Sequence, residues 1–136
     1  MKGIFSPLSL VILLASSQTF GQITSKCSTV YDMVEKMPTY DNGANGLINY
    51  LNRDLLPIVG DCMKRDGLIA SLHIVLTIDE EGKVIDATFP RQDLTDQCKN
   101  DLRNKLLTMT GWTAGQLDGR NVCTHFHWPI SCLKWE

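Results

Sequence analysis

Histidine and cysteine are the side chains of this 136-residue sequence with the clearest capacity for chemistry. Cys123, His125 and His127 follow one another at a spacing of two, and the remaining histidine is His73. In an extended strand, residues two apart point to the same side. Imidazole nitrogens and thiolates are ligands that zinc prefers. With His73 on a neighbouring strand, these residues form a candidate zinc or copper site. The competing interpretation is a group of solvent-facing imidazoles beside a disulfide-bonded Cys123.

The first 22 residues are typical of a secretory signal peptide. Lys2 gives a positive start, residues 8–15 are uninterruptedly apolar, and small or polar residues follow up to Gly21. The apolar run is shorter than the ~20 residues that span a bilayer. We therefore assign residues 1–22 to a cleaved signal. This predicts a periplasmic or secreted protein with no stable membrane insertion after cleavage.

The charge balance argues against several classes of partner. The sequence holds 13 Lys and Arg against 15 Asp and Glu. Lys2 is the only charged residue of the signal, so the rest carries 12 against 15, a net charge of −3. This composition does not favour nucleic acid or a membrane surface as partner. No Ser-His-Asp order, carboxylate pair or phosphate-binding loop stands out, so we expect a protein that is not an enzyme and has no cofactor.

Hydrophobic periodicity predicts one α+β domain over residues 44–136, preceded by an N-terminal extended segment at 23–43. The first expected helix begins at Ala44 and is ended by Pro57 and Gly60. A strand over 68–78, a turn at 79–82 and a return strand over 83–89 follow. The second helix is capped by Thr95 or Asp96 and stopped by Gly111, and it is followed by a loop over 112–120 and a last strand over 121–133. The simplest packing is a three-stranded antiparallel sheet with two helices on one face.

This topology also suggests how the five cysteines pair. An exported chain meets an oxidising compartment, where disulfides form. Cys62 lies between the first helix and the first strand. The start of the first strand, the end of the second strand and the start of the second helix share one end of the sheet, which brings Cys62 close to Cys98. Cys132 is a competing partner there, and Cys27 is expected to join Cys123. A disulfide between cysteines that lie tens of residues apart in the sequence adds roughly 3 kcal/mol to stability.

Several short motifs resemble the C-terminal domain of TonB in its stand-alone form. The matching segments are Val34 to Gly43 (a V-E-x-M-P-x-[FY]-x-x-G pattern), Ile74 to Val84 (a strand with a D-x-x-G turn), Trp112, Gly119 to Val122 (a G-K-x-V opening) and Trp128 to Cys132 (an L-P-I-x-F closing). Together they cover residues 34–133. The resemblance implies the same α+β fold and a habit of binding a protein or peptide.

The chain also departs from full-length TonB proteins. It has no histidine before His73, no Pro-rich spacer, and Trp112-Thr113-Ala114 where the family has W-x-P. The resemblance therefore implies a binding module without energy transduction of its own.

In TonB-like domains the last strand is an open sheet edge that accepts a strand from a partner. Here the matching residues are Val122, Thr124, Phe126, Trp128 and Ile130. The partner is expected to be a protein or an extended peptide, with an outer-membrane transporter or a second copy of the chain as candidates. An edge presents unpaired N–H and C=O groups, whereas Pro129 removes one donor. The alternative is that residues 23–43 cover this edge.

Overall fold

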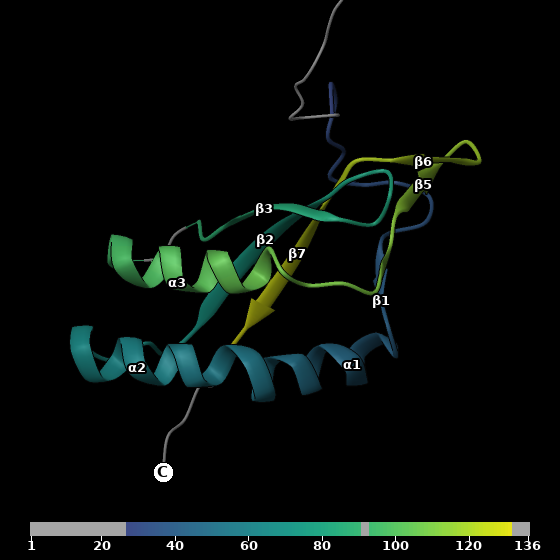
Figure 1. Ribbon diagram of the computed structural model, residues 1–136. Helices are drawn as coiled ribbons and strands as arrows, with labels where there is room; N and C mark the ends of the chain where they lie inside the picture. Colours follow the sequence, from purple (N-terminus) through teal and green to yellow (C-terminus); the bar gives the residue numbers. More distant parts are fainter. Residues whose placement is uncertain (1–26, 91–92, 132–136) are drawn as a thin grey trace, which may run out of the picture.

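The computed structural model describes residues 27–90 and 93–131. The expected signal peptide, residues 23–26 and Cys132 lie outside the described residues. Figure 1 shows a three-stranded antiparallel sheet, in the order β3-β2-β7, with helices on one face. This confirms the predicted α+β class.

The described elements follow the predicted order of helix, strand, strand, helix and strand, with further short strands. They are β1 (Thr39–Tyr40), α1 (Gly43–Tyr50), the π-helical turn η1 (Leu51–Leu55), α2 (Leu56–Asp66), β2 (Leu72–Ile78), β3 (Val84–Thr88), α3 (Asp96–Leu106), β4 (Trp112–Thr113), β5 (Gly115–Leu117), β6 (Arg120–Val122) and β7 (Thr124–Ile130).

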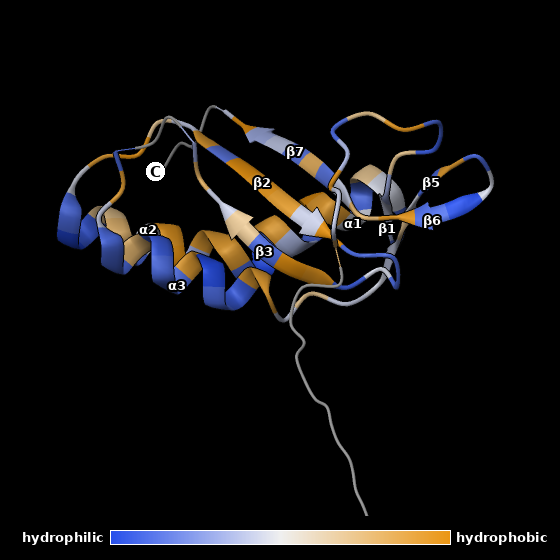
Figure 2. Ribbon diagram, turned by 90° about the horizontal axis from the view of Figure 1, so that it is seen from above, coloured by the Kyte–Doolittle hydropathy of each residue, from blue (hydrophilic) through white to orange (hydrophobic). Residues whose placement is uncertain are grey.

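The central strand β2 organises the core. Its alternate residues Leu72, Ile74, Leu76 and Ile78 are almost completely buried, so one face of the strand packs against the helices. Figure 2 shows this strand as largely hydrophobic between its two neighbours. β7 pairs with β2 along its whole length, from Ile130 opposite Leu72 to Thr124 opposite Ile78. The register therefore places every even-numbered residue of β7 on the core side of the sheet.

The turn between β2 and β3 is fixed by one carboxylate. The Asp79 side chain accepts hydrogen bonds from the N–H groups of Glu81 and Lys83, both at 2.9 Å. Gly82 supplies the positive φ of 82° that the turn requires. The predicted hairpin turn is confirmed, and Asp79 is buried because its acceptor groups are satisfied by the backbone.

The predicted end of the first helix at Pro57 and Gly60 is wrong. Figure 1 shows α1, η1 and α2 as one continuous rod from Gly43 to Asp66. In η1 the hydrogen bonds reach back five residues, and the Leu56 N–H bonds to the Leu51 carbonyl. Pro57 then falls in the first turn of α2, where a missing N–H costs little. Gly60 lowers helix propensity by ~1 kcal/mol relative to alanine, which burial of one helix face offsets.

The second helix begins as predicted and ends earlier. The Thr95 hydroxyl accepts a hydrogen bond from the Cys98 N–H at 3.2 Å, so Thr95 is the N-cap of α3. The helix ends at Leu106 rather than at Gly111. The Thr108 hydroxyl donates to the Lys105 carbonyl at 2.6 Å and satisfies an acceptor at the end of the helix.

Three predicted boundaries differ because very short strands carry no periodic signal. The segment expected as a loop over 112–120 contains β4 and β5, and the N-terminal segment contains β1, which pairs with β4. The last strand is interrupted at Cys123, so that β6 pairs with β5 while β7 joins the main sheet. The two-residue ladder of β1 and β4 joins distant parts of the chain, whereas β5 and β6 form a local hairpin around Asp118-Gly119.

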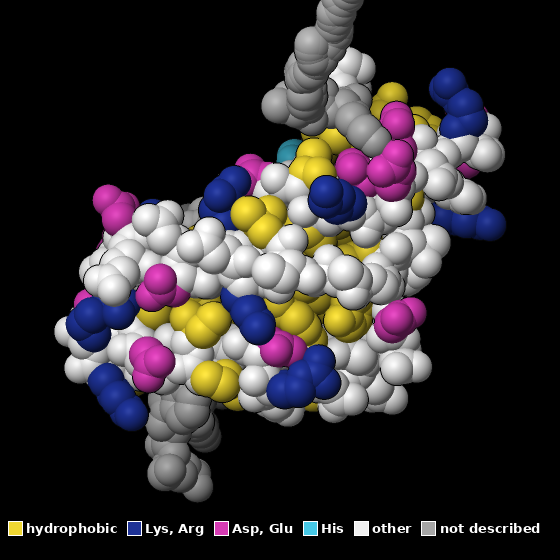
Figure 3. Space-filling model, viewed as in Figure 1, with side chains coloured by type: hydrophobic (Ala, Val, Ile, Leu, Met, Phe, Trp, Pro, Cys, Tyr) yellow, Lys and Arg dark blue, Asp and Glu magenta, His cyan; other side chains and the backbone are white. Residues whose placement is uncertain are grey.

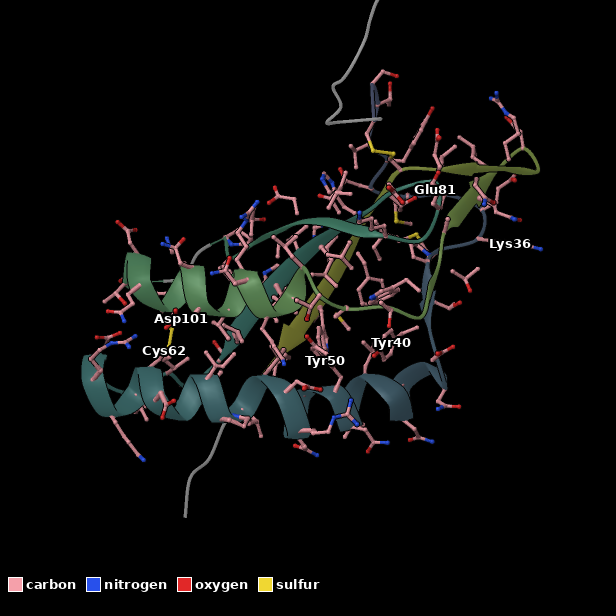
Figure 4. The ribbon with its side chains drawn as sticks, viewed as in Figure 1. Lys36, Tyr40, Tyr50, Cys62, Glu81 and Asp101 are labelled. Carbon is pink, nitrogen blue, oxygen red and sulfur yellow. A yellow bond between two sulfur atoms is a disulfide. The ribbon has the colours of Figure 1, made fainter. Side chains whose placement is uncertain are left out.

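Both expected disulfides are present. Cys62 of α2 is bonded to Cys98 of α3, with the Cα atoms 5.7 Å apart, and Figure 4 shows this bond between the two helices. Cys27 is bonded to Cys123, with the Cα atoms 5.9 Å apart. Two disulfides fit a protein that resides outside the cytoplasm. Within residues 27–90 and 93–131, no helix is long and apolar enough to span a bilayer.

Replacement of both Cys62 and Cys98 by alanine is expected to lower the free energy of unfolding by about 3 to 4 kcal/mol. The bond joins residues 36 positions apart, so its loss frees a loop of that size in the unfolded chain. Urea denaturation followed by circular dichroism measures the change. A loss below about 1 kcal/mol would show that this bond does not constrain the two helices.

Candidate functional site

β7 is an edge strand of the three-stranded sheet, and one half of its backbone groups faces away from the sheet. The His125 N–H donates to the Tyr31 carbonyl at 2.8 Å, which lies outside the sheet. In an antiparallel ladder the direction of N–H and C=O alternates from residue to residue. The outward-facing groups of β7 therefore belong to His125, His127 and Pro129, whereas the even-numbered residues bond to β2.

The N-terminal described segment crosses the start of this edge. We call residues 27–36 the strap, which Figure 1 shows in dark blue beside the start of β7. Tyr31 pairs with Thr124 in a parallel bridge, and its N–H donates to the Cys123 carbonyl at 3.0 Å. The strap is held at one end by the Cys27–Cys123 disulfide and at the other by the bridge of Lys36 to Gln116. It covers the first outward positions of β7 only.

One strap residue reaches the outer face of the sheet. The Asp32 carboxylate lies 2.8 Å from Nδ1 of His125 and 3.5 Å from Nε2 of His127. Hydrogen bonds from His125 and then from His127 hold the pKa of Asp32 below its ordinary value of 3.8. The side chain of Asp32 is 69% exposed, so solvent screens this interaction. The contact joins the strap to the two histidines of β7.

The three histidines gather on the outer face, as the sequence predicts. The ring centroids of His73 and His127 are 5.8 Å apart, and those of His125 and His127 are 6.4 Å apart. Cys123 is bonded to Cys27 and offers no thiolate, so the predicted fourth metal ligand is lost. Within the described ranges, no group of three or more His, Cys, Asp or Glu side chains is arranged to hold a metal ion. The carboxylate that accompanies these imidazoles is Asp32.

The side chains predicted for the partner-binding edge mostly point inward. Thr124, Trp128 and Ile130 are buried and Phe126 is half-buried, while Val122 lies in β6, before the main sheet. Phe126 packs on Trp112, with ring centroids 4.8 Å apart. These residues hold β7 against the core, and the groups available to a partner belong to the residues between them.

A short stretch of the β7 edge remains open beyond the strap. Among the described residues, no hydrogen bond is present at the carbonyl of His125 or at the N–H and carbonyl of His127. Pro129 has no N–H and limits pairing at the far end. The open edge therefore offers one donor and two acceptors in a row.

The opposite edge of the sheet is shielded by charge. Asp86 pairs with Thr77 and so lies on the outer face, whereas Arg103 comes from α3 on the inner face. The guanidinium reaches Asp86 with two hydrogen bonds of 3.0 and 2.9 Å. To do so it passes around the edge of β3, and charged side chains at an edge hinder strand addition.

Two further surfaces are less well suited to an extended peptide. A shallow hollow of about 730 Å³ lies on α2 and the turn before it, lined by Asn52, Leu56, Pro57, Gly60, Asp61, Met63 and Lys64. It offers helix side chains and no backbone groups in strand geometry. Figure 3 shows acidic and basic side chains interspersed over one face of the molecule, without a large patch of one sign. Such a surface does not favour a nucleic acid.

Comparison of this chain with protein-family models, with curated proteins and with solved structures finds no match.

Sequence reasoning missed Tyr31 and Asp32, the two strap residues that complete the site. Neither belongs to a periodic pattern, because the strap forms isolated bridges rather than a ladder. The expected pairing of Cys27 with Cys123 was an available signal. A bond there brings the residues that follow Cys27 beside those that follow Cys123, which include His125.

Replacement of Asp32 by asparagine is expected to increase amide exchange at His125 about two- to fivefold, because an exposed charged contact that holds the strap is weakened. Hydrogen exchange followed by NMR measures this effect. The matched control is Asp61→Asn, the same change on the exposed surface of α2, which leaves the exchange of His125 unaltered. Equal exchange in the Asp32→Asn variant and the unmodified protein would show that Asp32 does not hold the strap.

The Asp32 contact also has a defined pH window. Since the folded pKa of Asp32 is depressed, its stabilising contribution is present above the ordinary value of 3.8 and is lost as the pH falls through the folded pKa. The carboxyl ¹³C resonance of Asp32 should therefore titrate with a midpoint below 3.8. In a His125→Asn variant the midpoint should rise toward that value. A midpoint at or above 3.8 in the unmodified protein contradicts the assignment.

Proposed function

We propose that this protein is an exported, non-enzymatic binding module that recognises an extended peptide or protein segment through the edge of β7. It has no energy-transducing role of its own, and it acts in the periplasm or after secretion. The two disulfides support residence in an oxidising compartment. The order of motifs that resemble the TonB C-terminal domain supports the same kind of function.

The observation that carries the proposal is the strap itself. Tyr31 already lies on β7 as a strand would, with its N–H bonded to Cys123 and its carbonyl bonded to His125. The edge is therefore able to accept an extended segment in parallel orientation. Strand addition draws affinity from main-chain hydrogen bonds and specificity from side-chain contacts. The unpaired groups of His125 and His127 continue the same row toward Pro129.

The number of open backbone groups limits the strength expected for the proposed recognition. Three backbone groups in a row bind a segment of only a few residues, and each hydrogen bond contributes about 1 kcal/mol. The other sheet edge is crossed by Arg103, so two-sided addition is disfavoured. A weak and reversible interaction follows, in which the side chains of the partner decide specificity.

The decisive test compares two variants that differ in one N–H group. Peptides are selected from a random library on the disulfide-bonded protein, and their binding is measured for His127→Pro and His127→Val. Both variants lack the imidazole, but only valine keeps the outward N–H. We expect the proline variant to bind about tenfold more weakly, because a partner carbonyl is left unpaired.

Circular dichroism and the NMR spectrum of the remaining amides establish that both variants keep the fold. Equal affinity of the two folded variants would rule out the β7 edge as the binding surface. Selected peptides that shift the amides of α2 or β3, and not that of His127, would assign recognition to another surface.

A further inference from the structure

We infer that the β7 edge selects extended segments that carry an acidic side chain, received by His127 with His73 behind it. This inference rests on the proposed function and names the class of peptide that the same edge prefers. It follows from the way in which the strap already uses the edge, with Asp32 beside His125 at 2.8 Å.

The pairing of the strap can be continued along β7 in steps of two residues. A strand repeats its backbone direction every two residues, over about 6.8 Å. One such step moves the acceptor from the Cys123 carbonyl to that of His125, and the donor from the His125 N–H to that of His127. A segment added in this register meets a carbonyl and an N–H that lie two residues further along the chain than those that hold Tyr31.

The same step carries the carboxylate from one imidazole to the next. Asp32 follows the bridging Tyr31 and lies on the outer face, nearest to His125 and 3.5 Å from Nε2 of His127. An acidic residue that follows the bridging residue of an added segment comes beside His127, whose side chain is 49% exposed. His73 pairs with Pro129 across the sheet. The ring centroids of His73 and His127 are 5.8 Å apart. Two imidazoles therefore border the position of the added carboxylate.

The charged and titratable groups around His127 determine the pH dependence. Among the residues that the structure describes, they include Asp32 from the strap, His125 from β7 and His73 from β2. Protonated imidazoles attract carboxylates more strongly than neutral imidazoles do. In the protonated state they attract a second carboxylate beside Asp32. When the imidazoles are neutral, no positive charge offsets the repulsion between Asp32 and the carboxylate of the added segment. Acidic segments are therefore expected to bind more tightly at lower pH.

The strap also limits where an added segment begins. Asp32 lies closer to His125, at 2.8 Å, than to His127, at 3.5 Å, so the new strand starts at the next position and continues toward Pro129. A suitable probe therefore begins at the bridging residue. The peptide Ac-YDMV-NH2 has the sequence of residues 31–34, and Ac-YNMV-NH2 differs from it only by the loss of the charge.

The test is an NMR titration of the disulfide-bonded protein with each peptide at about pH 5.5 and about pH 8. We expect both peptides to shift the His127 amide. We expect the aspartate peptide to bind about three- to fivefold more tightly at the lower pH, as for an exposed ion pair. The preference should shrink at the higher pH and disappear in a His127→Val variant, which keeps the N–H.

The outcomes separate this inference from the function on which it rests. Equal binding of the two peptides, with the His127 amide shifted by both, overturns the acidic preference and leaves recognition by the β7 edge intact. A preference that persists in the His127→Val variant overturns the assignment to this imidazole. Absence of a shift at the His127 amide with either peptide overturns the inference, while the library selection decides the function independently.

Discussion

The alternation of backbone direction along β7 is the constraint on which both the fold and the proposed site depend. The even-numbered residues bond to β2 and bury their side chains, so they fix the last strand against the core. The odd-numbered residues direct their N–H and C=O groups outward and their side chains to the outer face. The same strand thus closes the core on one side and offers hydrogen-bonding groups on the other. The strap accepts the hydrogen bond of the His125 N–H, and Pro129 at the far end of the strand has no N–H to donate.

Much of the fold was predictable because its main elements bury long periodic patterns. Alternation in β2, the turn at Asp79–Gly82 and the cap at Thr95 each leave a local signal, and the structure has all three. The topology derived from them favoured Cys62–Cys98 with Cys132 as a competing partner, and Cys27 was then assigned to Cys123; both bonds are present. The predicted first helix ended too early because Pro57 is a helix breaker in most contexts. A π-helical turn placed this proline at the start of a new α-helical segment, and such a turn has no recognisable pattern in a single sequence.

The site was predictable in part. The spacing of His125 and His127 gave their shared face, and the strand order placed His73 near them. The contribution of Asp32 was not predictable, because it comes from a segment that folds through isolated bridges to distant residues. The disulfide removes Cys123 as a metal ligand, and the carboxylate of Asp32 lies beside the histidines, so these residues are interpreted differently. A group that suggested a metal site becomes a surface suited to an acidic side chain at a sheet edge, which remains a proposal.

Scalar couplings across hydrogen bonds test the central claim most directly, since they connect an amide nitrogen to the carbon of the carbonyl group whose oxygen accepts its hydrogen bond. In the free protein the account predicts a coupling from the His125 amide to the Tyr31 carbonyl. With a ¹³C-labelled peptide bound, it predicts an additional coupling from the His127 amide to a peptide carbonyl. A bound peptide that produces no coupling at His127, or a free protein without the coupling between His125 and Tyr31, would contradict the account.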